Sequence, residues 1–236
     1  MERLDKFISS QTEYSRSDIK KLINKRKISV NNIIISKSDI KINPNIDKVY
    51  IDEKLINYKE YVYLILNKPK GYISATEDRT QQTVLELVPK EFRIRELFPA
   101  GRLDKDTTGL MIITDDGNFS HEIFSPKKHI SKKYEVELDI PVTEEMKIGF
   151  KEGVKLNDGE CKTANLEIID KNRCIVTLTE GRYHQIKRMF GCFGAKVIEL
   201  NRIAIGGLEL PKNLTLGTCR EMTEIEKNSV KLDLKP

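Results

Sequence analysis

A change in hydrophobic pattern, at a short polar stretch from Asn57 to Glu60, sets the organisation of this 236-residue chain. Before that stretch, apolar residues recur at the i, i+3, i+4 spacing of amphipathic helices. After it they form short unbroken runs, of which "YVYLIL" is the first and is typical of a buried strand. A chain of this length is expected to form one or two domains. We therefore predict a small module at residues 1–56, a linker at 57–60 and a larger domain at 61–236.

The first module contains two groups of apolar residues at helical spacing. They are Leu4, Phe7 and Ile8, and then Ile19, Leu22 and Ile23. Each group predicts a short helix. The following "ISVNNIII" places Asn31 and Asn32 between β-branched runs. Because asparagine tolerates the left-handed backbone of a tight turn, we expect a strand pair there.

Positive charge is concentrated in the same module. Residues 1–56 contain 12 Lys and Arg against 8 Asp and Glu, whereas the remainder of the chain contains 29 against 28. Arg16 begins a basic cluster in which Lys20, Lys21 and Lys25 fall opposite the apolar residues of the second predicted helix. A basic face of this kind suits a polyanion, and a plain solvated helix face is the alternative.

The segment "GRLDKDTTGL", Gly101 to Leu110, is polar and turn-rich and runs directly into an apolar strand. An aspartate at the mouth of a buried strand is well placed for chemistry, which makes Asp104 a candidate. A calcium loop is disfavoured, because Thr108 and Asp115 depart from the ligand pattern and a strand begins where a helix should. No glycine-rich phosphate loop is present, so nucleotide hydrolysis is not supported.

Neither a metal site nor a membrane segment is indicated. The four cysteines, which are Cys161, Cys174, Cys192 and Cys219, show no C-x-x-C pairing, and the three histidines lie far apart. We expect reduced cysteines acting as small core residues, and no zinc. The longest apolar run is far too short to span a bilayer, and the N-terminus lacks an apolar signal core. We therefore expect a cytoplasmic protein.

Two resemblances extend these expectations. The ordered segments "RLDKFI", "SRSDIKKLI" and "ISVNN" resemble the S4 RNA-binding module, with Asn32 where members usually have Gly. The block "GRLDKDTTGL" resembles the signature of pseudouridine synthases of the RsuA/RluA superfamily. Supporting blocks occur in the family's order: "NKPKGYISA", "SKKYEVEL", "EGRYHQIKRMF" and "NRIAIGGLEL". Together the resemblances cover nearly the whole chain.

The resemblance implies an α+β fold. A small S4-like α/β module would precede a catalytic domain with a mainly antiparallel mixed sheet flanked by helices. It also implies that the protein converts a uridine in RNA to pseudouridine, and that this reaction needs no cofactor or metal.

The family's nucleophile corresponds to Asp104. Alternation in "YEVEL" would turn Tyr134 inward, and the resemblance points to this ring for stacking on the uracil and moving the C5 proton. Lys187 lies where these enzymes carry a cation beside the nucleophile, which would keep Asp104 ionised in a dry pocket. A plain core tyrosine and a solvated lysine are the alternatives for these two residues.

Ten residues are expected to contact RNA. They are Arg16, Lys20, Lys21 and Lys25 in the first module, and Arg102, Lys132, Lys133, Arg182, His184 and Arg188 in the second. Arg102 would fill the space left by an extruded uridine or hold the backbone. Charge tracks of this kind give affinity that depends on salt and not on sequence.

The block "EGRYHQIKRMF" is most similar to the branch of the family that modifies small-subunit 16S rRNA, which implies uridine 516 as the target. The expected partner is this RNA in a partly assembled small subunit. A monomer is expected because no heptad pattern is visible. Two alternatives stay open: a synthase acting on large-subunit 23S rRNA, and a non-catalytic rRNA-binding assembly factor.

Overall fold

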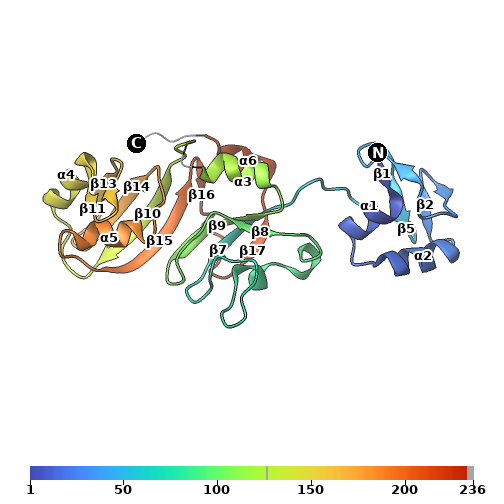
Figure 1. Ribbon diagram of the computed structural model, residues 1–236, viewed down its shortest axis with the longest axis horizontal. Helices are drawn as coiled ribbons and strands as arrows, with labels where there is room; N and C mark the ends of the chain where they lie inside the picture. The colour runs from blue at the N-terminus through green and yellow to red at the C-terminus, as the bar shows by residue number, and fades with distance from the viewer. Residues whose placement is uncertain (126, 233–236) are drawn as a thin grey trace. The chain divides into compact units, whose positions relative to one another are not determined.

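The computed structural model describes residues 1–125 and 127–232, whose contacts group into two units (Figure 1). Unit 1 comprises Met1–Val62 together with Pro89–Glu96. Unit 2 comprises Tyr63–Val88 together with the chain from Leu97 onward. The last four residues of the predicted 61–236 domain lie outside the described part of the chain.

Unit 1 contains the two helices and the strand pair that the sequence predicts. Its elements are β1 (Glu2–Arg3), α1 (Leu4–Gln11), α2 (Arg16–Asn24), β2 (Ile28–Val30), β3 (Ile33–Ile34), β4 (Lys41–Ile42), β5 (Val49–Ile51), β6 (Lys54–Leu55) and the 3-10 helix η2 (Lys90–Phe92). The apolar faces of α1 and α2 are buried in one core with β2 and β5 of the sheet β3-β2-β5-β6. Ser15 caps α2 by accepting a hydrogen bond from the backbone N–H of Asp18. Asn31 and Asn32 adopt φ values of 51° and 66° between β2 and β3, which confirms the predicted turn.

Within the described residues, unit 2 is built on a sheet of nine strands. They are β7 (Tyr63–Lys68), β8 (Phe98–Ala100), β9 (Thr108–Thr114), β10 (Lys132–Leu138), β13 (Asn165–Ile168), β14 (Arg173–Leu178), β15 (Val197–Ile205), β16 (Leu208–Glu209) and β17 (Cys219–Glu221). The main order is β13-β14-β10-β15-β9-β7-β17, with β16 paired to β15 and β8 to β9. Strands β9 and β15 run parallel, and the other neighbours run antiparallel. The expected mainly antiparallel mixed sheet is confirmed.

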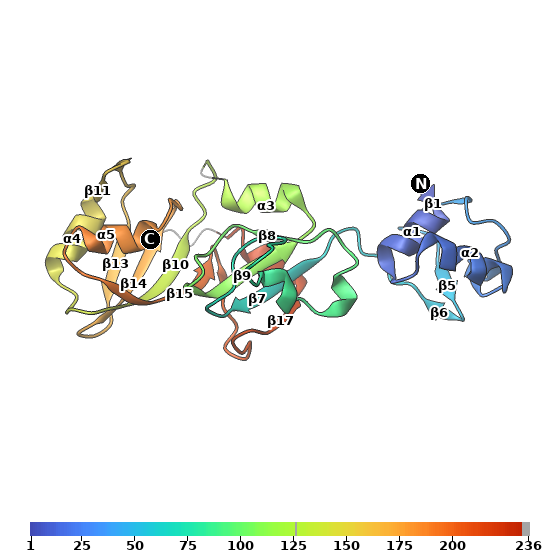
Figure 2. The same cartoon turned by 60° about the horizontal axis from the view of Figure 1, so that its bottom comes forward.

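Helices cover the two halves of this sheet separately (Figure 2). On β10, β13 and β14 lie α4 (Glu144–Glu152) and α5 (Gln185–Gly191), whose core rings Phe150 and Phe190 have centroids 4.7 Å apart. On β7, β8 and β9 lies α3 (Gly117–Phe124). The remaining elements are η1 (Val84–Leu87), β11 (Lys155–Leu156), β12 (Gly159–Glu160) and α6 (Glu224–Ser229). Across residues 1–125 and 127–232, every helix is too short or too polar to cross a membrane.

The parallel contact between β9 and β15 joins the two halves, and Gly109 makes that contact possible. Gly109 lies opposite Arg202 with a φ of 102°. A Cβ at this position would lie 2.3 Å from the backbone oxygen of Arg202. Only glycine fits such an approach. The loop that carries Asp104, which directly precedes β9, therefore lies where the two halves of the sheet meet.

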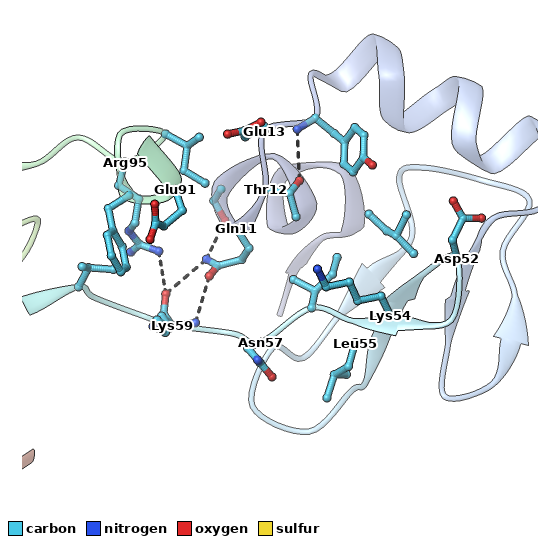
Figure 3. A pocket seen from close by; sticks show the side chains of 17 residues that line it. Gln11, Thr12, Glu13, Asp52, Lys54, Leu55, Asn57, Lys59, Glu91 and Arg95 are labelled. Atoms are coloured by element: carbon cyan, nitrogen blue, oxygen red, sulfur yellow. Dashed lines mark hydrogen bonds between the residues drawn. The ribbon is translucent and has the colours of Figure 1, made fainter. Parts of the chain in front are cut away.

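Segment 89–96 groups with unit 1, although the hydrophobic pattern placed it in the second module. Figure 3 shows Gln11 and Arg95 both directed at Lys59 in the predicted linker. The side chain of Gln11 bonds to both the carbonyl and the N–H of Lys59, at 3.3 and 3.0 Å. Arg95 donates to the carbonyls of Lys59 and Glu60, at 2.9 and 2.6 Å. These bonds fix the backbone of the predicted linker within unit 1.

The close approach at Gly109 predicts a large loss of stability on substitution. We expect Gly109→Ala to lower the free energy of unfolding by at least about 2 kcal/mol, because the methyl group meets backbone and the backbone stays in the left-handed region. Gly117→Ala is the matched control, since nothing lies within 4 Å of its Cβ position. Urea unfolding of both variants tests this, and equal midpoints for the two variants would contradict it.

Candidate active site

A cavity of about 520 Å³ opens beside the loop that precedes β9. The three expected catalytic residues, Asp104, Tyr134 and Lys187, all line it. Three of the residues expected to contact RNA line it too: Arg102, Arg182 and His184. The volume is within the range typical of small-molecule pockets. Residues from both halves of the sheet therefore meet in one space.

The backbone of the Asp104 loop is held by a buried lysine, Lys68, at the end of β7. Its side chain is 0% exposed. Its Nζ donates to the carbonyls of Asp104, Lys105 and Thr107, at 3.0, 3.3 and 2.8 Å, and to that of Pro69 at 3.2 Å. Burial lowers the pKa of Lys68 to about 8, and the carboxylates of Asp106 and Asp104 act in the opposite direction.

A second anchor of the loop is Ser74. Its hydroxyl donates to the carbonyl of Leu103 at 2.8 Å and accepts from the N–H of the same residue at 2.9 Å. Sequence reasoning missed Ser74 and Lys68 as site residues, although both belong to the block "NKPKGYISA". The available signal was a lysine at the end of an apolar strand, where alternation places it on the buried side with Leu66 and Leu64.

The Asp104 carboxylate lies between two side chains that can carry positive charge. His184 Nε2 is 3.5 Å from Asp104 Oδ1, and Lys187 Nζ is 3.8 Å from Asp104 Oδ2. The Asp104 side chain is 29% exposed, so the carboxylate reaches the cavity without being fully solvated. Neither cation is in tight hydrogen-bond contact with it, which leaves the carboxylate oxygens accessible to a substrate.

The tightest partner of Lys187 is Asp106 and not Asp104. Lys187 Nζ lies 2.6 and 2.7 Å from the two carboxylate oxygens of Asp106. The hydrogen bond from Lys187 holds the pKa of the Asp106 carboxyl below its usual value. Sequence reasoning missed this pairing, because Asp104 and Asp106 are both within reach of a lysine side chain and only geometry separates them.

Tyr134 both packs against a core and lines the cavity, so its position is compatible with either of the two alternatives. It is half-buried on β10, opposite Val176 on β14 and Arg202 on β15. Its ring packs against the core of α4 and α5, and it also lines the cavity. A ring fixed by packing on one side can present a rigid surface to a planar base on the other.

Arg182 and Arg188, two of the expected RNA contacts, are engaged within the protein. Both guanidinium groups pair with Asp158, Arg182 at 2.7 Å. Arg182 also donates to the carbonyls of Gly159 and Glu160, at 3.0 and 3.1 Å. Arg188 donates to the carbonyl of Tyr183 at 2.9 Å. These bonds anchor the segment that leads into α5.

The remaining expected RNA contacts differ in exposure. Lys132 is buried, at 7% exposure, with its ammonium over the ring of Phe124 at 5.6 Å from the centroid. Lys133 is half-buried and Arg102 is exposed at the cavity. In unit 1 the four expected cations are all exposed: Arg16, Lys20, Lys21 and Lys25. Lys21 lies 3.2 Å from Asp18 on the same helix.

Within residues 1–125 and 127–232, no three His, Cys, Asp or Glu side chains are grouped so that they could hold a metal ion. Cys161 and Cys174 are buried, as expected of core cysteines. Cys192 is exposed, so the expectation that all four serve the core is wrong for this residue. It is the residue directly after α5.

Comparisons with known proteins agree on one kind of protein. Residues 62–191 match the family described as RNA pseudouridylate synthase, and residues 2–45 match the S4 domain. The ribosomal small subunit pseudouridine synthases A of Salmonella typhimurium and Escherichia coli K12 are each 40% identical to this chain over 230 residues, covering 97% of it and 99% of the relative. An RNA pseudouridine synthase of Bacillus subtilis is 38% identical over 230 residues, covering 95% of this chain and 96% of its own. A crystal structure of a pseudouridylate synthase superposes with a TM-score of 0.69 at 37% identity, covering 98% of this chain and 100% of that chain.

The buried ammonium of Lys68 predicts a loss of stability when it is removed. We expect Lys68→Met to lower the free energy of unfolding at pH 7 by about 3 kcal/mol, because the loop carbonyls lose a charged donor inside the protein. Lys70→Met is the control, since Lys70 is exposed and pairs with Glu199 on the surface. Urea unfolding measures both, and similar small losses in the two variants would contradict the anchoring role.

The same lysine predicts a pH dependence. The folded pKa of about 8 lies below the value of 10.5 for a free lysine, so between these values the unfolded chain binds more protons than the folded one. Stability from this group therefore rises with pH across that window and is lowest below pH 8. The difference in unfolding free energy between wild type and Lys68→Met should grow from pH 8 to 10.5. A constant difference, with Lys70→Met as reference, would contradict this assignment.

Proposed function

The chain belongs to the RNA pseudouridylate synthase family, and on that premise we propose that it isomerises one uridine of small-subunit 16S rRNA to pseudouridine, with Asp104 as the nucleophile. The choice of RNA is supported by relatives from two organisms that carry small-subunit names and align with nearly all of this chain. The observation that carries the mechanism is the convergence of Asp104, Tyr134 and Lys187 on one cavity. Uridine 516 is the target that the resemblance implies.

The reaction starts with capture of the base. The target uridine leaves its stack and enters the cavity, because the bond to be broken is out of reach within a helix. Arg102, exposed beside Asp104, occupies the vacated space or holds the RNA backbone. The uracil then lies against the ring of Tyr134.

Asp104 attacks as a carboxylate, so the site must keep it ionised after water has left. Lys187 and, when protonated, His184 supply positive charge within 4 Å of the two oxygens. Asp106 holds the Lys187 ammonium at this place through the two shorter contacts. The attack is either on the base or on the sugar, and both routes break the bond between uracil N1 and the ribose C1′.

The second half of the reaction rejoins the same two pieces. The detached uracil turns, and its C5 forms the new bond to C1′. The bond that Asp104 had formed to the base or the sugar breaks, which regenerates the carboxylate. The proton on C5 leaves and N1 gains one, so the product is an isomer of the substrate. Tyr134 is the group placed to take the C5 proton, since its ring lines the cavity that holds the base.

The physical setting of the substrate is part of the proposal. The S4 domain at the N-terminus supports an RNA partner, and we place the reaction on 16S rRNA in a partly assembled small subunit, with the protein acting as a monomer.

Removal of the nucleophile tests the proposal directly. Asp104→Asn should lower the rate of pseudouridine formation by at least about a thousandfold, because an amide is not a nucleophile of this kind. Carbodiimide-based mapping of unmodified 16S and 23S rRNA, free and in partly assembled particles, measures the product. Asp39→Asn, an exposed carboxylate in unit 1, is the control for the chemical change alone.

A single stop in 16S rRNA that needs wild-type protein is the expected result. A stop in 23S rRNA instead would keep the mechanism and move the substrate to the large subunit. Full turnover by folded Asp104→Asn would remove Asp104 as the nucleophile.

The basic face of α2 predicts a separable effect on RNA binding. Lys20→Glu with Lys21→Glu should weaken RNA affinity by at least about tenfold at low salt and flatten its salt dependence, because two exposed cations change sign. Turnover at saturating RNA should survive. Lys147→Glu with Lys151→Glu on α4 changes the net charge equally and serves as the control. Fluorescence anisotropy titrations would contradict the assignment if both double variants lost the same affinity.

A further inference from the structure

Tyr183 is an exposed aromatic side chain at the edge of the cavity. It is 76% exposed, against 42% for Tyr14 and 41% for Tyr61, the other exposed tyrosines in the described part of the chain. It lines the same cavity as Asp104. A tyrosine ring is a large apolar surface with a polar tip, and such rings are enriched where a partner covers them.

This exposed ring is nevertheless held in place. It stacks on the imidazole of His184 with centroids 3.8 Å apart and an angle of 21° between the planes. The Tyr183 carbonyl accepts a hydrogen bond from Arg188, and the preceding Arg182 bonds to the carbonyls of Gly159 and Glu160. A side chain that is already ordered loses little freedom on binding. The ring therefore has the properties of a preformed contact surface.

His184 connects this surface to the nucleophile. Its Nε2 is 3.5 Å from Asp104 Oδ1, and its backbone has a left-handed φ of 48° at the start of α5. The imidazole thus contacts Asp104 through its edge and Tyr183 through its face. The imidazole of His184 therefore lies between the Tyr183 ring and the Asp104 carboxylate.

We propose that Tyr183 is a stacking platform for an unpaired nucleobase next to the target uridine. When a uridine is extruded, the adjoining bases lose a stacking neighbour, and RNA-binding proteins commonly offer aromatic rings to such bases. The inference rests on the proposed function, because it needs an RNA whose uridine enters the cavity at Asp104.

The surroundings of Tyr183 favour a base over a phosphate as its ligand. Two guanidinium groups from the same segment, those of Arg182 and Arg188, both pair with Asp158. Their charge is thereby partly neutralised, which weakens attraction for the RNA backbone at this rim. A π-face remains, and every nucleobase can stack on it.

The test is a double-mutant cycle between protein and RNA. The RNA is the rRNA segment that mapping shows the wild-type protein to modify, whether it comes from the small or the large subunit. A set of further substrates is made from this RNA, each lacking the base at one position within two nucleotides of the target uridine. Wild type, Tyr183→Ala, Tyr183→Phe and the control Tyr61→Ala are compared by kcat and KM. The exposure of Tyr183 means that its alanine variant should fold, which circular dichroism checks.

Tyr183→Ala should lower kcat/KM about tenfold on the complete RNA, mainly through KM, and Tyr183→Phe should restore most of the loss. Removal of the base at one of these positions should reduce the kcat/KM of the wild-type protein by the same factor. On that abasic substrate, Tyr183→Ala should have the same kcat/KM as wild type. An unchanged KM in Tyr183→Ala, an equal loss on every abasic substrate, or a phenylalanine variant as weak as alanine would each overturn the inference while leaving the proposed function intact. Absence of pseudouridine with wild-type protein in all rRNA would overturn both.

Discussion

The geometry of the site depends on one buried cation whose hydrogen-bond acceptors are backbone carbonyls. Lys68 is fully buried at the end of β7, which pairs with a strand on each side, and its ammonium donates hydrogen bonds to carbonyls of the loop that carries Asp104. Burying a charge is costly unless its hydrogen bonds are satisfied. If the loop moved away, the Lys68 ammonium would either become exposed to water or stay buried without its hydrogen-bond acceptors. The backbone of Asp104 is therefore fixed to the sheet itself, which gives a polar, turn-rich loop a defined position.

The second requirement is that two halves of one sheet meet at this loop. The parallel pairing of β9 with β15 brings the Asp104 loop beside β10 and α5, which supply Tyr134 and Lys187. The ion pair between Asp106 and Lys187 links the loop to α5 directly, and its exposed position limits its own energetic contribution. Packing in the two cores sets the positions of the loop and of α5, and the ion pair with Asp106 then holds the Lys187 side chain. We therefore expect the geometry of the site to be affected less by substitution of its exposed charged residues than by substitution where β9 pairs with β15.

The sequence was sufficient wherever a local pattern determines the structure. Helical spacing predicted both helices of unit 1, and alternation on β10 predicted the inward ring of Tyr134. The same alternation places Lys132 on the face of Tyr134, so its burial was predictable although it was expected to contact RNA. The mainly antiparallel type of the sheet was not predictable from periodicity and came from the family resemblance, whereas the order of the strands was not predicted. The tighter pairing of Lys187 with Asp106 than with Asp104 was beyond sequence reasoning, because both carboxylates lie within 4 Å of the Lys187 ammonium and only the distances in the fold separate them.

Most of the excess positive charge lies in unit 1 and the cavity lies in unit 2, which bears on how the proposed enzyme would select a uridine. Residues 1–56 hold most of the excess positive charge, and their cations on α2 are exposed. In unit 2, Arg182 and Arg188 are paired with Asp158 and Lys132 is buried, so fewer cations remain available to phosphates than the sequence suggests. Phosphate contacts hold RNA without reading its sequence, whereas base contacts distinguish one nucleotide from another. On the proposed function, we therefore expect attraction to RNA to arise chiefly in unit 1, and discrimination among uridines to depend on the rings and carboxylates around the cavity.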